Sequence, residues 1–411
     1  MRILFLIHCY PPDVIGGHEV RCQRTVEGLR ARGHEVLVLT TYCRTNGPSR
    51  DGHVLRVLRS KWSEDPNRTA LKWVAVYRHN VKRFRQTLRE FRPEVICQWN
   101  LNWCTAAFVQ HVHETAPAPV VEFPGGEISP VPDDLWYHYC RTPAAGLAAD
   151  WVKRATVAMA GRLMPTAPKA FPYGTVSFPS PSTRDFWLAQ GAQVMDPGVV
   201  YSGIDLERFP GRSGESYQHP PRFLFVGRLG PEKDPITVLE AFARVQERKE
   251  TATRDSELAL TVVAGTGLEP DYVQRARARI EELTPAVQLH EMVPHDKMPG
   301  VYAAHEVFIL SSDREGFPNV LLEAWASGLA VLSTRCGGPD EILADGENCL
   351  TFPFGDADAL AAQMERLITD PELVVKLGQA GRRLVEERFT LDRYIGEVER
   401  LLESTIARAD R

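Results

Sequence analysis

Residues 307–324 have the sequence VFILSSDREGFPNVLLEA, in which two apolar runs enclose a polar loop. The run 307–310 is typical of a buried strand, and Pro318 stands at the threshold of a helix. Glu315 lies on the loop, and Glu323 lies about one turn inside the helix. Because the first N–H groups of a helix have no partners within it, they form a ready anion site. The stretch therefore predicts an α/β fold with an anion site between two carboxylates.

The 411 residues include 44% hydrophobic side chains, enough for two α/β domains that each have a core. The eight cysteines show no C-x-x-C pairing or metal-ligand spacing, and several fall within apolar runs. We therefore expect buried free thiols in a reducing cytoplasm and no zinc site. No apolar run reaches the length of a membrane span, and the N-terminal run is too short for a signal peptide, so a soluble protein is expected.

The net charge of −5 is unevenly distributed along the chain. Residues 1–200 hold 24 Lys and Arg against 17 Asp and Glu, so the N-terminal half is basic and the C-terminal half is acidic. A basic amphipathic helix is predicted over about 69–91. Two interpretations stay open: the helix 72–92 packs on a sheet with its polar face in solvent, or it contacts an anionic membrane surface.

The N-terminus has the same order of strand, loop and helix. An apolar strand over 2–8 is followed by a loop and by a helix that ends at Gly33. Gly16 and Gly17 would let the backbone approach a ligand at the carboxyl edge of the strand, where open parallel sheets bind ligands. An ordinary tight turn would use the same glycines. Further strands are predicted over 35–40, 53–58, 94–98 and 118–123.

The order of strand, loop and helix is repeated after residues 210–221. These residues are rich in Gly, Ser and Pro and are predicted to be a linker. Arg228 and Lys233 lie on the new loop, and two cations at the carboxyl end of a strand suit a diphosphate. Exposed surface cations would give the same pattern. The G-T-G sequence at 265–267 resembles part of a dinucleotide fingerprint, but Pro270 stands where the third glycine would be, which argues against a nicotinamide site.

The run E-G-F-P-N-V-L-L-E-A at 315–324, followed by S-G-L-A-V-L and G-G-P-D-E-I, closely resembles the E-x7-E signature of family-four glycosyltransferases, which are retaining enzymes of the GT-B fold. G-G-H-E at 16–19 and G-R-L-x-x-E-K-D at 227–234 are similar to the same family. The resemblance implies two Rossmann-like, doubly wound α/β domains facing a central cleft. These would be an acceptor-binding domain at 1–209, joined by a C-terminal helix at 390–411, and a nucleotide-sugar-binding domain at 222–389.

The resemblance implies that a sugar moves with retention from a nucleoside-diphosphate sugar, with a UDP-sugar as the expected donor, to a hydroxyl acceptor. No metal or other cofactor is expected. Arg228 and Lys233 would stabilise the leaving diphosphate, Glu315 would hold hydroxyls of the transferred sugar, and Glu323 would hold the ribose hydroxyls. Arg228, Lys233 and Glu315 are thus the expected catalytic residues. The other donor-binding residues that it implies are Gly16, Gly17, Gly265, Gly267, Met292, Val293, Gly316, Phe317, Pro318, Asn319, Val320 and Leu321.

The acceptor is expected on the first domain, which is net basic and holds seven of the eight tryptophans. Many relatives carry a histidine after the fifth strand of that domain, but residues 120–127 contain none, so Glu122 or Glu127 takes its place or the site is built differently. The expected acceptor-side residues are Trp99, Asn100, Asn102, Trp103, Glu122, Glu127 and Trp136. Either Trp99 or Trp103 could equally be a core residue. The expected acceptor is hydroxylated and anionic or lipid-linked, and a neutral small metabolite is the alternative. The protein is expected in the cytoplasm, with the inner face of the membrane as an open alternative, and no nucleic-acid partner is expected.

Three other functions fit parts of the pattern. A sugar-nucleotide epimerase could share the scaffold but should lack the E-G-F-P-N-V-L-L-E run. A sugar phosphorylase would need an inorganic phosphate or cofactor site, for which we identify no signal in the sequence. A non-catalytic nucleotide-sugar-binding protein would have degraded site residues, whereas Arg228, Lys233, Glu315 and Glu323 are all intact.

Overall fold

The chain forms two compact units, one made of Met1–Val200 with Ile395–Arg411 and the other of Tyr201–Tyr394. The second unit begins earlier than the predicted end of the first domain at residue 209, because Ile204 and Phe209 are core residues of the second unit. The computed structural model describes residues 1–14, 16–42, 47–60, 70–101, 104–126, 138, 140, 142, 147–166, 172–212, 217–250, 258–265, 267, 269–291 and 293–411.

The first unit contains an eight-stranded sheet in the order β3-β4-β2-β1-β5-β6-β7-β8. Neighbouring strands are parallel except for β3, which is antiparallel to β4. Strand β1 lies between β2 and β5 and is buried on both faces, which explains its continuous apolar sequence. The strands are β1 (Arg2–Leu6), β2 (Glu35–Thr41), β3 (Ser49–Asp51), β4 (Val54–Leu58), β5 (Val95–Gln98), β6 (Val120–Glu122), β7 (Tyr173–Phe178) and β8 (Val194–Val199).

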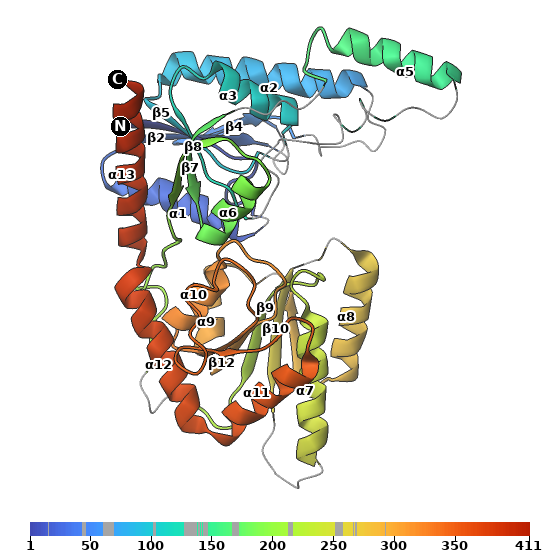
Figure 1. Ribbon diagram of the computed structural model, residues 1–411, viewed down its shortest axis with the longest axis vertical. Coiled ribbons are helices and arrows are strands. Elements are labelled where there is room, and N and C mark those ends of the chain that lie inside the picture. The colour runs from blue at the N-terminus through green and yellow to red at the C-terminus, as the bar shows by residue number, and fades with distance from the viewer. Residues whose placement is uncertain are drawn as a thin grey trace. The chain divides into compact units, whose positions relative to one another are not determined.

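Helices cover both faces of this sheet, with α2 and α3 on one face and α1 on the other (Figure 1). The part of α13 that belongs to this unit packs on α1, because a Cβ on Gly28 would lie 2.6 Å from the side chain of Ile395. Glu399 of α13 accepts a hydrogen bond from Arg32 at 2.7 Å. The helices are α1 (Gly17–Ala31), α2 (Ala70–Phe91), α3 (Ala106–Thr115), α5 (Leu147–Ala160), α6 (Pro181–Ala189) and α13 (Leu391–Ala409).

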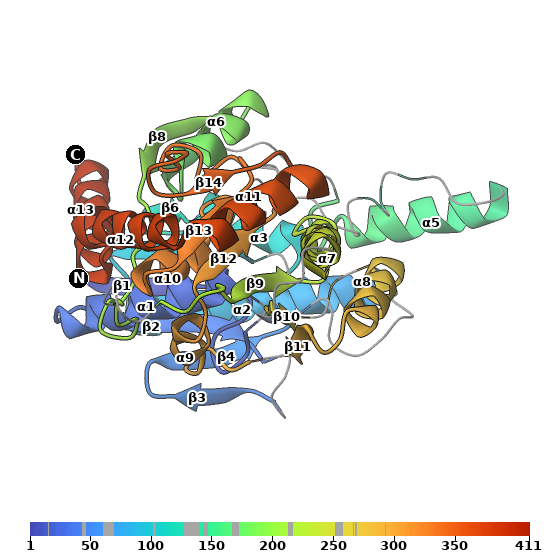
Figure 2. The same cartoon turned by 90° about the horizontal axis from the view of Figure 1, so that it is seen from below.

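The second unit contains a six-stranded parallel sheet in the order β11-β10-β9-β12-β13-β14, which can be followed in Figure 2. One core lies under α7, α8 and α11, and a second core lies under α9 and α10 on the opposite face. Its strands are β9 (Phe223–Arg228), β10 (Leu260–Gly265), β11 (Val287–Glu291), β12 (Val307–Leu310), β13 (Ala330–Ser333) and β14 (Leu350–Thr351). Its helices are α7 (Pro235–Glu250), α8 (Pro270–Glu282), α9 (Met298–Ala303), α10 (Asn319–Ala326), α11 (Ala357–Thr369) and α12 (Pro371–Arg388).

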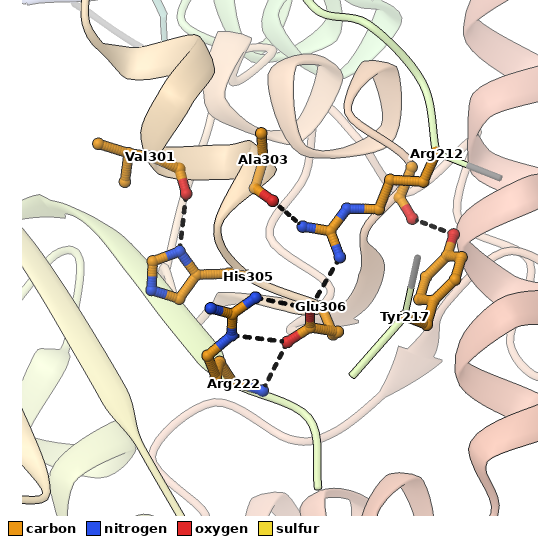
Figure 3. A network of polar contacts seen from close by, with 8 residues as sticks. Arg212, Tyr217, Arg222, Val301, Ala303, His305 and Glu306 are labelled. Carbon is orange, nitrogen blue, oxygen red and sulfur yellow. Dashed lines mark hydrogen bonds and ion pairs between the residues drawn. The ribbon is translucent and has the colours of Figure 1, made fainter. Parts of the chain in front are cut away.

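A buried carboxylate ties the amino ends of the two central strands together (Figure 3). Glu306, which immediately precedes β12, is fully buried and pairs with Arg212 at 2.8 Å and with Arg222 at 3.0 Å. The backbone N–H of Arg222, just before β9, also donates to Glu306 at 2.9 Å. The same contacts anchor the described part of the predicted linker, since Arg212 lies within it. The opposite, carboxyl ends of these strands carry the predicted site.

Seven cysteines lie in the part of the chain that the structure describes, and none of these seven forms a disulfide. Six of them are buried, which confirms the expected buried thiols for those positions; Cys43 lies outside the described residues. Among the helices that the structure describes, none combines the length and the apolar character needed to cross a bilayer.

Candidate functional site

The loop after β9 carries the two predicted cations. Arg228 is the last residue of β9, and Lys233 precedes Asp234 at the start of α7. Asp234 adopts a positive φ of 46°, which is uncommon for a residue other than glycine. Its carboxylate accepts hydrogen bonds from the hydroxyl of Thr237 at 2.5 Å and from that of Tyr272 at 3.0 Å. These bonds fix the loop conformation next to Lys233.

The loop after β12 is hydrogen-bonded directly to the loop after β9. Ser311 Oγ donates to the carbonyl oxygens of Lys233 at 2.7 Å and Asp234 at 3.1 Å. The N–H of Asp313 donates to the carbonyl oxygen of Glu232 at 3.0 Å. Since β9 and β12 are adjacent parallel strands, their carboxyl ends meet at one edge of the sheet. The fold therefore brings the two predicted loops together.

Lys233 and Glu315 form an ion pair across these loops. Ser312 Oγ donates a hydrogen bond to the same carboxylate oxygen, Glu315 Oε1, at 2.7 Å. The backbone at Glu315 is also fixed, because its N–H donates to the Cys336 carbonyl at 2.7 Å and its carbonyl accepts from the N–H of Gly338 at 2.8 Å. Two of the three residues expected to be catalytic are thus in direct contact.

Arg228, the third of these residues, has a more exposed position. Its guanidinium lies 2.7 Å from a carboxylate oxygen of Glu232, and the two side chains are 40% and 42% exposed. Ion pairs with this exposure contribute little, so an anionic ligand can replace Glu232 at modest cost. Among the described residues, a Cβ on Gly265 would have only Arg228 Cγ within 4 Å. Gly267 differs, because a Cβ there would clash with the carbonyl oxygen of Leu229.

The N-terminus of α10 follows the β12 loop, as predicted. Pro318 is the N-cap, and its own side chain forms no capping hydrogen bond. Asn319 and Val320 are partly buried, whereas Phe317 and Leu321 are core residues. The side chains of Phe317 and Leu321 therefore stabilise the fold, and only the backbone at these positions can contact a ligand.

Glu323 lies one turn inside α10 and is 4% exposed. Its Oε2 accepts a hydrogen bond from the hydroxyl of Tyr302 on α9 at 3.0 Å. A ligand hydroxyl at Glu323 would therefore share the carboxylate with Tyr302. Val293 is partly buried and packs against the same core as Tyr302, whereas Met292 lies outside the described residues.

The glycine pair of the first unit forms an open turn at the start of α1. The N–H of Gly16 donates to Glu19 Oε2 at 2.8 Å, which caps the helix. Gly16 and Gly17 are exposed, and a Cβ on Gly16 would meet none of the described residues within 4 Å. Packing within the first unit therefore does not require glycine at position 16, so close approach of a ligand remains the predicted reason for it.

His18 is a residue of this turn that the sequence analysis did not select. Its ring centroid lies 4.9 Å from that of Trp99, and its Nε2 accepts a hydrogen bond from the N–H of Asn100 at 3.3 Å. A Cβ on Gly125 would lie 3.1 Å from His18 Nδ1, so the ring packs over Gly125 in the loop after β6. Burial, followed by the charge of Arg21, lowers the pKa of His18 to about 3. The neutral ring therefore carries its proton on Nδ1.

This contact bears on the histidine that the resembled family carries after β6. The present chain has Gly125 in that loop, and the histidine that reaches the loop comes from the start of α1 instead. The sequence signals for His18 were its place directly after Gly16 and Gly17 and its presence in the G-G-H-E sequence that is similar to the family.

Two acceptor-side predictions need correction or qualification. Trp99 is fully buried and stacks on Phe123 with ring centroids 4.8 Å apart, so it is a core residue and its ring is not open to an acceptor. Glu122 accepts a hydrogen bond from Gln98 at 2.8 Å and lies 3.3 Å from His113, so internal partners already hold its carboxylate.

Asn100 contributes backbone groups, since its carbonyl accepts from the N–H of His8 at 2.9 Å. Four acceptor-side residues lie outside the described residues: Asn102, Trp103, Glu127 and Trp136. No cluster of three or more metal-ligating side chains is present among the residues that the structure describes.

The fold and the site define a two-domain α/β protein with a predicted anion-binding loop in its second unit. Residues 16–170 match the family described as Glycosyl transferase 4-like domain, and residues 211–384 match that described as Glycosyl transferases group 1. The first unit therefore contains a glycosyl transferase 4-like domain, and the second unit contains a group 1 glycosyltransferase domain.

Two curated relatives and one solved structure illustrate the match. The lipopolysaccharide core biosynthesis glycosyltransferase LpsE of Rhizobium meliloti is 40% identical over 88 residues, which are 21% of this chain and 26% of LpsE. Glycogen synthase of Mycobacterium tuberculosis is 23% identical over 410 residues, covering 95% of this chain and 91% of the synthase. HepE of Anabaena, solved in complex with UDP-glucose, has a TM-score of 0.69 at 19% identity and covers 98% of this chain and 100% of its own. The fold is GT-B.

Proposed function

We propose that this chain is a retaining glycosyltransferase that moves a sugar from a UDP-sugar to a hydroxyl acceptor and needs no metal. The observation that carries the proposal is the contact between Lys233 and Glu315 beside the N-terminus of α10. A cation, a carboxylate and a helix N-terminus at one edge of a parallel sheet match the phosphate and hydroxyl groups of a nucleotide sugar. The UDP-glucose complex of HepE supports the choice of base.

Stabilisation of the leaving group is the main chemical task of such a site. When the bond between the sugar C1 and the phosphate oxygen breaks, negative charge develops on the diphosphate and positive charge on the sugar. Lys233, Arg228 and the first N–H groups of α10 would stabilise the diphosphate, and preorganised donors of this kind each contribute about 3 kcal/mol. These groups supply the positive charge that a metal ion would otherwise provide.

The two glutamates position the donor in this proposal and do not attack it. Glu315 holds hydroxyls of the transferred sugar, and Glu323 holds the ribose hydroxyls. The acceptor oxygen bonds to C1 on the face from which the phosphate leaves, and its proton passes to the leaving phosphate oxygen. The anomeric configuration is then retained without a covalent enzyme intermediate.

The acceptor in this proposal is a hydroxylated molecule that is anionic or lipid-linked. The net positive charge of residues 1–200 supports it. We place the reaction in the cytoplasm, with the basic helix α2 contacting the inner face of the membrane. Since Trp99 is a core residue, acceptor recognition by aromatic side chains would fall to Trp103 and Trp136.

A thermal-shift panel of UDP-, GDP- and ADP-sugars tests the donor. A ligand at a hundred times its Kd adds about 2.7 kcal/mol to the free energy of unfolding, so the correct donor should raise the Tm measurably. The donor that binds is then incubated with candidate acceptors, and NMR coupling constants give the anomeric configuration of the product. Failure of every nucleotide sugar to raise the Tm, or an inverted product, would overturn the proposal.

A further inference from the structure

Helix α5 of the first unit exposes large apolar side chains. Trp151 is 72% exposed and Met159 is 56% exposed, and Val152 and Leu163 also lie on the surface. Among the described residues, the large hydrophobic side chains most open to solvent thus include four from this short stretch. Isolated exposed hydrophobic residues are ordinary, whereas a contiguous group of them marks a surface that another body covers.

Those of these side chains that lie on α5 share one face of the helix. Trp151, Ala155 and Met159 are four residues apart and therefore lie on successive turns, with Val152 beside them, and Leu163 lies in the turn that follows the end of α5 at Ala160. We call these five residues the α5 face. The side chains of Ala155 and the other four are all exposed.

The opposite side of the helix is attached to its own unit at one end. Ala160 and Met164 pack with Trp73 and Val74 of α2 in a small core cluster. Figures 1 and 2 both show α5 extending from the first unit away from its sheet. The helix therefore has a buried apolar end and, separately, an exposed apolar face that the core of the unit does not explain.

The charges around the α5 face are positive. Arg154 and Arg162 are exposed, and the only acidic residue of α5, Asp150, is paired with Arg154 at 2.6 Å. The adjacent α2 is also basic and has a single acidic residue, Glu90. Among the described residues of α5, the apolar face with Trp is bordered by Arg and has no exposed carboxylate. Such a face is complementary to a surface with an apolar interior and an anionic outer layer. The interface of a membrane with anionic lipids has this profile.

We propose that the α5 face inserts into the headgroup region of a membrane containing anionic phospholipids, with Arg154 and Arg162 contacting the headgroups. The apolar contact is made by α5, and the cations of α2 contribute electrostatic attraction to the same anionic surface. The inference does not depend on the reaction that the chain catalyses.

Co-sedimentation of the full chain with vesicles tests the proposal. The vesicles contain phosphatidylcholine alone or phosphatidylcholine with about a third of phosphatidylglycerol. The wild type should bind the mixed vesicles, and binding should fall as salt rises. The double variant Trp151→Ser, Met159→Ser should bind at least about tenfold more weakly, because the apolar contact is lost. The double variant Arg154→Gln, Arg162→Gln should bind the mixed vesicles more weakly than the wild type does. Its binding to vesicles of phosphatidylcholine alone should equal that of the wild type.

A matched control comes from the same unit. Leu188 and Met195 are exposed apolar residues on α6 and β8, and Leu188→Ser with Met195→Ser should bind vesicles as the wild type does. Far-ultraviolet circular dichroism and Tm confirm that each variant is folded. Equal binding by the Trp151 and Met159 variant, or no binding by the wild type, would overturn the proposal. The proposal would also be overturned if the wild type formed a concentration-dependent dimer, did not bind vesicles, and lost the dimer in this variant. A second copy of the chain would then cover the α5 face.

Discussion

Lys233 and Glu315 are separated by 82 positions in the chain, yet their side chains form an ion pair at the carboxyl ends of β9 and β12. The pair is mostly shielded from solvent, with the two side chains 23% and 12% exposed. A diphosphate that takes Lys233 as a partner must compete with Glu315 for it. Displacement of the lysine would release the carboxylate for sugar hydroxyls, so the two predicted roles are coupled in one contact.

The first prediction separates the roles of the two glutamates. Glu315→Gln should abolish turnover. Its affinity for free UDP should be unchanged or slightly higher than that of the wild type, because UDP no longer competes with a carboxylate for Lys233. Glu323→Gln should weaken UDP by about tenfold, since hydrogen bonds to a charged group contribute about 1.5–3 kcal/mol. Isothermal titration calorimetry with UDP measures both. Equal losses in the two variants would contradict the assignment of roles.

The second prediction concerns the leaving group. Lys233→Met and Arg228→Met should each lower kcat by about tenfold or more, because each removes a cation from the developing phosphate charge. Turnover of the wild type should be unchanged in EDTA. A matched control is Arg244→Met, which removes an exposed ion pair with Asp358 outside the site. Loss of wild-type activity in EDTA, restored by magnesium or manganese, would show that the electrostatic account is wrong.

Local sequence was sufficient to predict β12, the loop after it and α10. The apolar run 307–310 has the length of a strand and is followed by polar residues, and Pro318 favours the first turn of a helix. The contact of Lys233 with Glu315 could not be derived in the same way. It depends on β9 and β12 being neighbours in the sheet, which is a property of topology and not of either segment.

Trp99 and α5 show why other features escaped prediction. A tryptophan at the end of a strand can be either a core residue or a ligand contact. The ring of Trp99 packs against Phe123 and Phe5, which makes it a core residue. The apolar residues of α5 largely face solvent, so the rule that apolar residues point inward gives no information about that helix. His18 was missed because its partners, Asn100 and Gly125, are distant in sequence.

The third prediction concerns the buried Glu306. Glu306→Gln should lower the free energy of unfolding of the second unit by about 3–5 kcal/mol, because Arg212 and Arg222 would keep their charges without a carboxylate. Glu365→Gln is a matched control, since its pair with Arg248 is exposed and should contribute less than about 1 kcal/mol. Urea unfolding monitored by circular dichroism measures both differences.

The pH dependence of stability in the wild type and in Glu306→Gln gives a further test. Burial alone would raise the pKa of Glu306, but hydrogen bonds from Arg222 and Arg212 lower it below its usual value of 4.5. A carboxyl group whose pKa is lower in the folded state contributes stability above pH 4.5 and loses that contribution as the pH falls through the lowered pKa. The difference between wild type and Glu306→Gln should therefore be constant near neutral pH and shrink in acid. A difference independent of pH down to acid unfolding would contradict the ion-pair account.

The last prediction concerns His18, whose pKa is about 3 in the folded chain and 6.5 in an ordinary environment. Burial is the main cause, and the charges of Arg21 and His8 act in the same direction. Between these two values the unfolded chain binds a proton that the folded chain does not. The free energy of unfolding must therefore rise with pH over this window and fall on acidification below about pH 6.5.

His18→Gln removes that proton linkage and keeps an amide that can accept from Asn100. Between pH 6.5 and 5 the wild type should lose about 1–2 kcal/mol more than His18→Gln, measured by urea unfolding. Parallel pH profiles of the two proteins, or an NMR titration that places the His18 pKa near 6.5, would show that the ring is not packed against Trp99 and Gly125 in solution.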